Sequence, residues 1–132
     1  MDNKNETLII NLRKLYEQYG YKKISLPTFE EYDLYSEYRD FIKSEKILTL
    51  MTPEGKLEAL RPDITLSVAK KVAKDKNIKS EKIYYVENIY RFSKMNGYKE
   101  KRQLGIELIG TETEFLNYEI TNLALKSLQE IN

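Results

Sequence analysis

Hydrophobic residues recur every three to four positions in three stretches of the chain, a spacing that predicts amphipathic helices. Residues 7–19 carry leucine, isoleucine and tyrosine at this spacing, and Gly20 follows where a C-terminal helix cap is expected. The same period returns in residues 63–75 and again in residues 114–131. The chain is therefore expected to contain three helices.

Other segments have the composition or alternation of strands. Residues 22–26 are short and partly alternating, and Pro27 ends them. Residues 46–52 and 56–60 flank Pro53-Glu54-Gly55, a turn sequence, and so predict a hairpin.

Two further strands are predicted near the end of the chain. Residues 81–92 and 100–109 are rich in tyrosine, isoleucine, valine and leucine, and they surround a polar loop that contains a glycine. The whole pattern predicts an α+β fold, a mostly antiparallel sheet flanked by helices. We expect residues 1–132 to form one domain.

Composition narrows the class of protein. The chain has 132 residues, and no apolar run approaches the roughly 18 residues that a membrane-spanning helix needs. Its first 20 residues lack the pattern of a secretory signal, so a cytoplasmic location and no membrane association are expected. With 22 basic and 21 acidic side chains, nucleic acid is not an expected partner.

The absence of two residue types limits the available chemistry. The chain contains no histidine and no cysteine. It therefore cannot form a Ser-His-Asp or Cys-His nucleophilic site, nor a zinc site built on imidazole or thiolate. Any chemistry must use carboxylate, amide, hydroxyl, arginine, lysine or tyrosine side chains, and no cofactor or metal is predicted.

The strand at 103–109 carries a candidate polar site. Gln103, Gly105 and Glu107 share one face, whereas the leucine and isoleucine residues between them share the other face and are expected in the core. The glycine is expected to leave open space for a small polar ligand. Arg91, on the preceding strand, is expected beside this pair. The alternative is a solvated sheet face with one cross-strand ion pair.

The segment ALRPDITLSVAK, residues 59–70, joins a strand to a helix. Pro62 and Asp63 suit a helix start, but a helix start does not account for Arg61. The Asp63 carboxylate and the Thr65 hydroxyl are together suited to accept hydrogen bonds from a ligand ammonium group. A capping role for Asp63 is the simpler alternative.

Three blocks in order resemble one family. YGYKKISLPTFEEYDLY (residues 19–35) resembles motif 1 of class II aminoacyl-tRNA synthetases, especially histidyl-tRNA synthetase. ALRPDITLSVAK resembles that family's Leu-Arg-Pro-Glu-x-Thr segment. YRF (residues 90–92) with KRQLGIELIG (residues 101–110) resembles its motif 2 arginine and the following Gln-x-Gly-x-Glu strand. The resemblance implies a class II synthetase-like catalytic-core fold, of which motif 3 and the anticodon-binding domain are not found here.

Within this family the residues resemble the regulatory subunit of ATP phosphoribosyltransferase more than the synthetase. Asp63 stands where the synthetase usually has glutamate, and Arg91 is followed by Phe92 and Ser93, without the carboxylate of the synthetase's Arg-x-Glu. The loop after Arg91 also lacks a clear counterpart of the second arginine that would grip ATP. The resemblance therefore implies a subunit that is not an enzyme.

The resemblance also implies ligands and partners. Asp63, Thr65, Gln103 and Glu107 match residues that bind histidine, with Glu107 toward the imidazole ring, and Arg91 matches a phosphate or carboxylate contact. Such a subunit associates with the short catalytic subunit of ATP phosphoribosyltransferase and transmits feedback inhibition by L-histidine. Two alternatives stay open: a catalytic-core fragment of histidyl-tRNA synthetase, and a dimerisation scaffold with a decayed pocket.

Motif 1 of this family lies at a dimer interface. The resemblance therefore implies a homodimer with Tyr21, Ile24, Leu26 and Pro27 near the contact. The alternative is that these apolar residues seal the core of a single chain.

Overall fold

The chain divides into two compact units, each built from segments that are distant in the sequence. The computed structural model describes residues 2–38, 40, 42–43, 46–75, 80–110 and 113–131. The terminal unit contains Met1–Ile24, Asn77–Tyr85 and Leu104–Asn132, and the central unit contains Ser25–Lys76 and Val86–Gln103. Whether residues 1–132 behave as one domain stays a prediction.

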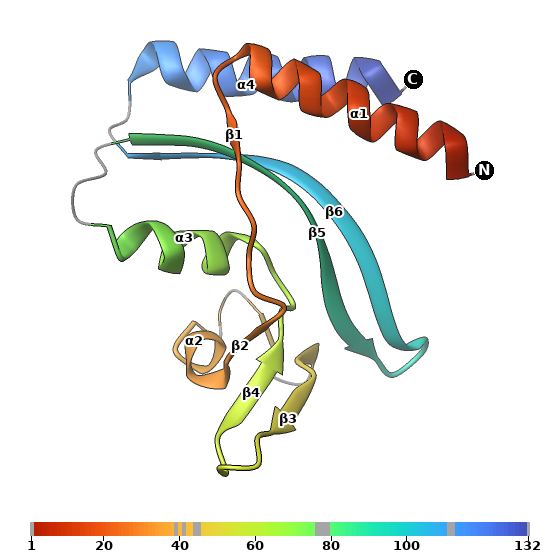
Figure 1. The fold of residues 1–132 in the computed structure, drawn as a ribbon, viewed down its shortest axis with the longest axis vertical. Helices are drawn as coiled ribbons and strands as arrows, with labels where there is room; N and C mark the ends of the chain where they lie inside the picture. Colours follow the sequence, from red (N-terminus) through yellow and green to blue (C-terminus); the bar gives the residue numbers. More distant parts are fainter. Residues whose placement is uncertain are drawn as a thin grey trace. The chain divides into compact units, whose positions relative to one another are not determined.

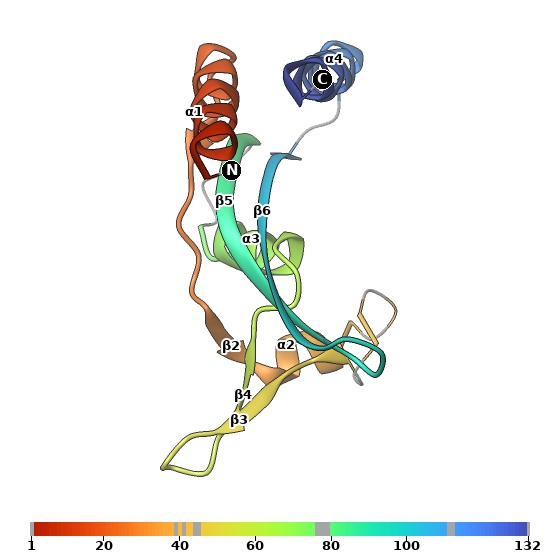
Figure 2. The same ribbon diagram turned by 90° about the vertical axis from the view of Figure 1, so that its right-hand side faces the viewer.

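The terminal unit pairs two helices with part of a three-stranded sheet. Its helices are α1 (Asp2–Gln18) and α4 (Glu114–Ile131), and its strand β1 (Lys22–Lys23) runs parallel to β5 (Ser80–Ser93). The sheet order is β1-β5-β6, with β6 spanning Gly97–Gly110. Both helices lie on the same side of this sheet (Figures 1 and 2).

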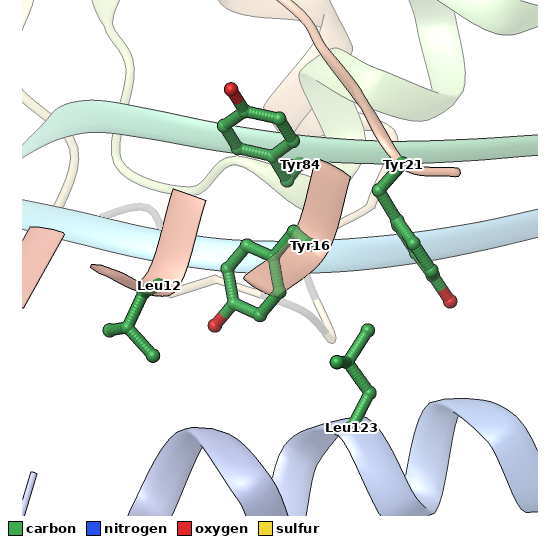
Figure 3. Packing of buried hydrophobic residues seen from close by; sticks show 5 residues of the cluster. All are labelled: Leu12, Tyr16, Tyr21, Tyr84 and Leu123. Atoms are coloured by element: carbon green, nitrogen blue, oxygen red, sulfur yellow. The ribbon is translucent and has the colours of Figure 1, made fainter. Parts of the chain in front are cut away.

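Aromatic and aliphatic side chains from both helices and the sheet form the core of the terminal unit. Five buried residues meet there: Leu12, Tyr16, Tyr21, Tyr84 and Leu123 (Figure 3). Leu104 and Ile106 of β6 pack against this cluster, which confirms the predicted apolar face of that strand. Burial of such side chains supplies the main driving force for folding.

Helix α1 ends where the sequence predicted but begins earlier. Gly20 adopts a φ of 83°, and its N–H donates to the Glu17 carbonyl at 3.0 Å, as a helix cap requires. The predicted cap is confirmed. The helix begins at Asp2, five residues before the predicted start, in a polar segment where hydrophobic spacing is uninformative.

The central unit contains a second small sheet and two helices. Strands β2 (Phe29–Glu31), β4 (Leu57–Leu60) and β3 (Thr49–Met51) pair antiparallel in that order, so the predicted hairpin is confirmed. Helix α2 covers Tyr32–Ser36 and α3 covers Thr65–Ala73. The core of this unit is a cluster of five residues: Tyr35, Ile42, Ile47, Ala59 and Leu66.

The predicted α+β class, with mostly antiparallel strands and packed helices, is confirmed, and the strands form two sheets. The strand predicted at residues 22–26 keeps only two residues in the ladder, because the carbonyls of Ser25, Leu26 and Pro27 accept hydrogen bonds from side chains. Strand β2 and helix α2 were not predicted. Strand β6 begins at Gly97, three residues before the predicted start at residue 100, so the loop between β5 and β6 is shorter than predicted.

Candidate functional site

The Arg61-Pro62-Asp63 segment connects β4 to α3 inside the central unit. Arg61 is only 1% exposed. Its Nη1 donates to the Leu26 carbonyl at 3.0 Å and to the Pro27 carbonyl at 2.8 Å. These bonds hold the extended chain that leads into β2.

The other side of the guanidinium faces β5. Arg61 Nε and Nη2 donate to the Asn88 carbonyl at 3.0 and 2.7 Å, and Nη2 also pairs with Glu87 Oε2 at 3.1 Å. Glu87 Oε1 accepts from the Leu26 N–H at 3.2 Å. A buried charge requires such pairing. Arg61 is thus a structural residue. This explains why an arginine precedes Pro62 and Asp63, which the helix start alone did not explain.

The two residues after Arg61 also have defined contacts. Asp63 Oδ1 accepts from the Leu66 N–H at 3.2 Å in the first turn of α3, so the capping role is confirmed. The Pro62 carbonyl accepts from Arg91 Nε at 2.8 Å. Thr65 is the first residue of α3. Asp63, Thr65 and Arg91 therefore all belong to the central unit, and this segment contacts Arg91 through the Pro62 carbonyl.

Arg91 lines a basic cavity of about 370 Å³ beside the tip of the β5–β6 hairpin. Its lining includes five cationic residues: Lys46, Arg91, Lys94, Lys99 and Lys101. None of the described residues that line it is acidic. Arg91 Nε donates to the Pro62 carbonyl and the residue lines this cavity, while its predicted position beside Gln103 and Glu107 stays a prediction. The cavity suits an anion.

The predicted open space above Gly105 is not present. A Cβ added at Gly105 would lie 2.6 Å from Tyr85 Cζ and closer still to the hydroxyl. Tyr85 is 4% exposed and comes from β5, the strand that pairs with β6. The prediction was wrong because it considered one strand alone, and a large side chain of the neighbouring strand fills the room that glycine leaves. Tyr85 therefore lies where the sequence predicted open space.

The four residues expected to bind histidine belong to different units. Asp63, Thr65 and Gln103 lie in the central unit, and Glu107 lies in the terminal unit. A histidine pocket shared by all four stays a prediction. The lysines of the basic cavity were also missed, although Lys94, Lys99 and Lys101 stand close together in the sequence around the tip of the hairpin.

The residues expected at a dimer interface differ in exposure. Tyr21 and Leu26 are buried within the chain, Ile24 is half-buried and Pro27 is exposed. Burial raises the pKa of the Tyr21 phenol, and Glu119 adds to this effect. The dimer itself stays a prediction.

In the part of the chain that the structure describes, no helix is long and apolar enough to cross a membrane.

A family model described as histidyl-tRNA synthetase matches residues 2–132. The chain belongs to this family. Histidine--tRNA ligase of Methanococcus maripaludis strain S2 is 36% identical over 98% of the chain, which spans 32% of that relative. The ATP phosphoribosyltransferase regulatory subunit of Clostridium novyi strain NT is 35% identical over 91% of the chain, which spans 30% of that relative.

Solved structures of the histidyl-tRNA synthetase family share the fold. An ATP phosphoribosyltransferase regulatory subunit/histidyl-tRNA synthetase from Bacillus halodurans matches with a TM-score of 0.83 and 27% identity, over 97% of this chain and 34% of that one. The apo histidyl-tRNA synthetase of S. aureus matches with a TM-score of 0.73 and 26% identity, over 97% of this chain and 35% of that one. The predicted synthetase-like fold is confirmed, and the chain spans about a third of the length of these relatives.

Proposed function

We propose that this chain acts as a non-catalytic regulatory subunit of ATP phosphoribosyltransferase in histidine biosynthesis. The observation that carries the proposal is the cavity at Arg91. Ser93 stands in its lining where the synthetase has a carboxylate that helps to hold ATP, and no described lining residue is acidic. Several relatives bear the regulatory-subunit name, which supports the same proposal.

The proposed ligand is L-histidine, which has an ammonium group, a carboxylate and an imidazole ring. Asp63 and Thr65 would accept hydrogen bonds from the ammonium group, together with Gln103, and Glu107 would bind the imidazole ring. Arg91 offers a positive charge to the ligand carboxylate or to a phosphate. The proposed partners are the short catalytic subunit and a second copy of this chain, in the cytoplasm.

Calorimetric titration with L-histidine tests this proposal, with and without the short catalytic subunit. We expect saturable binding, and Glu107→Gln should weaken it roughly 10–100-fold, because a hydrogen bond to a charged group contributes about 1.5–3 kcal/mol. Asp63→Asn keeps an acceptor for the α3 cap and should weaken binding similarly. Glu54→Gln, in the exposed β3–β4 turn, is the matched control and should bind normally.

An absence of binding heat in both titrations would contradict the regulatory proposal, provided that the catalytic subunit is folded. If dimerisation and binding of the catalytic subunit persisted without histidine binding, the chain would instead be a scaffold with a decayed pocket.

The second candidate is a catalytic-core fragment of histidyl-tRNA synthetase, and the same cavity favours it. Lys94, Lys99 and Lys101 surround Arg91 with the positive charge that adenylate formation needs on the phosphates of ATP. Histidine-dependent exchange between ATP and pyrophosphate separates the two candidates. If the chain catalyses this ATP–pyrophosphate exchange and Arg91→Ala abolishes it, the chain is a synthetase fragment. Histidine binding without such exchange supports the regulatory subunit.

A further inference from the structure

The turn that joins β5 to β6 contains an asparagine followed by a glycine. Lys94, Met95 and Asn96 form the turn, and Gly97 begins β6 (Figure 1). Gly97 has a φ of 66°, and the Asn96 N–H donates to the Ser93 carbonyl at 3.2 Å. Hairpin turns of three residues commonly have a glycine of this conformation at their end. The turn therefore explains Gly97, but it does not explain the amide side chain before it.

The side-chain amide of Asn96 is free to rotate. Asn96 is exposed, and its side chain has no hydrogen-bond partner among the described residues. Asn88, in the same hairpin, differs in both respects that matter for reactivity. Its Nδ2 donates to Glu100 at 2.6 Å, and a branched residue, Ile89, follows it. Asn96 is the one asparagine in the sequence that a glycine follows, and glycine has no Cβ to obstruct attack by its backbone nitrogen.

Asn96 also lines the basic cavity. Arg91, Lys94 and Lys99 line the same cavity, and no described lining residue is acidic. Nearby positive charge favours the anionic form of a group. These cations therefore favour loss of the proton from the Gly97 backbone nitrogen. They also stabilise the oxyanion that forms when this nitrogen attacks a carbonyl carbon.

We propose that Asn96-Gly97 is a site of spontaneous deamidation, which the cations of the cavity promote. The Gly97 backbone nitrogen loses its proton to hydroxide and attacks Cγ of Asn96. A new C–N bond closes a succinimide ring, and the bond from Cγ to the side-chain nitrogen breaks as ammonia leaves with a proton from water. Water then adds to one of the two ring carbonyls, one ring C–N bond breaks, and the Gly97 nitrogen regains a proton. The net reaction consumes one water and releases one ammonia, without oxidation or reduction.

The modification changes the charge of the cavity. The product is aspartate or isoaspartate at position 96, so a carboxylate appears in a described lining that had no acidic residue. A negative charge there opposes binding of an anion. The cavity should therefore lose anion affinity as the protein ages. This inference concerns the cavity alone and depends neither on histidine binding nor on the regulatory role.

Incubation of the whole chain at pH 8, with peptide mass mapping at intervals, tests the proposal. We expect Asn96 to be converted before Asn88, with the mass change of NH2 replaced by OH and with isoaspartate at the same position. Lys99→Ala should slow the conversion about twofold or more, and so should added salt, because exposed charges interact modestly and are screened. Lys56→Ala, at an exposed position outside the described lining, is the matched control and should leave the rate unchanged.

Calorimetry with pyrophosphate measures the effect on the cavity. Asn96→Asp introduces the charge at once and should lower the affinity about twofold to fivefold, as expected for one exposed charge. Asn96→Gln keeps a neutral amide and should retain its affinity through the incubation that weakens binding by the unchanged chain. This variant thus separates deamidation from general ageing of the protein.

Three results would overturn the proposal. The first is conversion of Asn96 no faster than that of Asn88. The second is a rate of conversion that changes neither with salt nor in Lys99→Ala, which would exclude promotion by the cavity. The third is pyrophosphate affinity that stays the same after full conversion. Mass mapping requires no ligand, so its result is distinct from success or failure of the histidine titration.

Discussion

At the scale of single residues, Arg61 shows how a charge can be structural in a segment that resembles a ligand site. Its guanidinium binds three backbone carbonyls and Glu87, and it is almost fully buried. Lysine has a single ammonium group and cannot reproduce this planar set of donors. Arg61 therefore stabilises the central unit, whatever ligand binds nearby.

Replacing Arg61 should strongly reduce the free energy of unfolding. Arg61→Ala leaves Glu87 and the three carbonyls without their donor, and we expect a loss of about 3–5 kcal/mol. Urea denaturation followed by circular dichroism measures it. Lys14→Ala, at an exposed basic position of α1, should change little. Equal stability of the two variants would contradict this role for Arg61.

Tyr35 makes stability depend on pH at the alkaline end. Burial raises the pKa of Tyr35 to about 12, despite an opposing hydrogen bond to Ser67. The unfolded chain releases this proton near pH 10, so above that pH the unfolded state is increasingly favoured. The free energy of unfolding should therefore fall between about pH 10 and pH 12, by no more than about 1.4 kcal/mol per pH unit from this group.

Denaturation curves at pH 8 and pH 11 measure the contribution of Tyr35. Tyr35→Phe has no proton to lose and should show a smaller fall than the unchanged chain. A part of the fall should remain, because burial also raises the pKa of Tyr21, Tyr84 and Tyr90. An identical fall in both proteins would show that Tyr35 ionises alike in the folded and unfolded states.

At the scale of elements, the pairing of β5 with β6 decides what the candidate site looks like. Gly105 was correctly placed on the face of Gln103 and Glu107, since alternation in a strand is a local property. Tyr85 was not expected above it, because the register of two strands depends on how they pair. The space beside Gly105 is therefore filled by a phenol ring.

Adding a side chain at Gly105 should displace Tyr85. Gly105→Ala places a methyl group against the ring, and we expect a loss of about 1–3 kcal/mol in the free energy of unfolding. With Tyr85→Leu in the background, the same change should cost less, because the smaller side chain can yield. A double-mutant cycle by urea denaturation measures this coupling. Strictly additive effects would mean that the two residues do not compete for space.

At the scale of the whole molecule, an almost neutral chain carries a strongly uneven charge distribution. The net charge is +1, yet five cations line one cavity and no described lining residue is acidic. The nearly neutral composition gave no reason to expect an anionic ligand. The cluster of cations beside the folded hairpin does give such a reason. This local field supports ligand binding through charge rather than through shape alone.

Pyrophosphate is a suitable probe of this cavity. We expect binding that weakens as salt rises, because ions screen exposed charges. Lys99→Ala and Lys101→Ala should each reduce affinity, whereas Lys56→Ala, at an exposed position outside the described lining, should not. Calorimetry at two salt concentrations measures both effects. If the affinity for pyrophosphate changed neither with salt nor in Lys99→Ala and Lys101→Ala, pyrophosphate would bind outside this cavity.

The sequence by itself determined the features that depend on near neighbours. Helix α4 was predicted with its observed bounds, the caps at Gly20 and Asp63 were identified, and the apolar face of β6 was assigned correctly. Helical period, capping and strand alternation act over a few residues, so one sequence contains them. The three ordered motifs, which are also local patterns, identified the family.

Only the tertiary structure decided the features that join distant segments. The partners of Arg61 come from residues 26–27 and 87–88, Tyr85 reaches Gly105 from a neighbouring strand, and the basic cavity collects Lys46 with the hairpin lysines. None of these contacts follows from sequence spacing, because each depends on which elements pack together. Local chemistry therefore specified the elements, and their packing specified which residues can form a site.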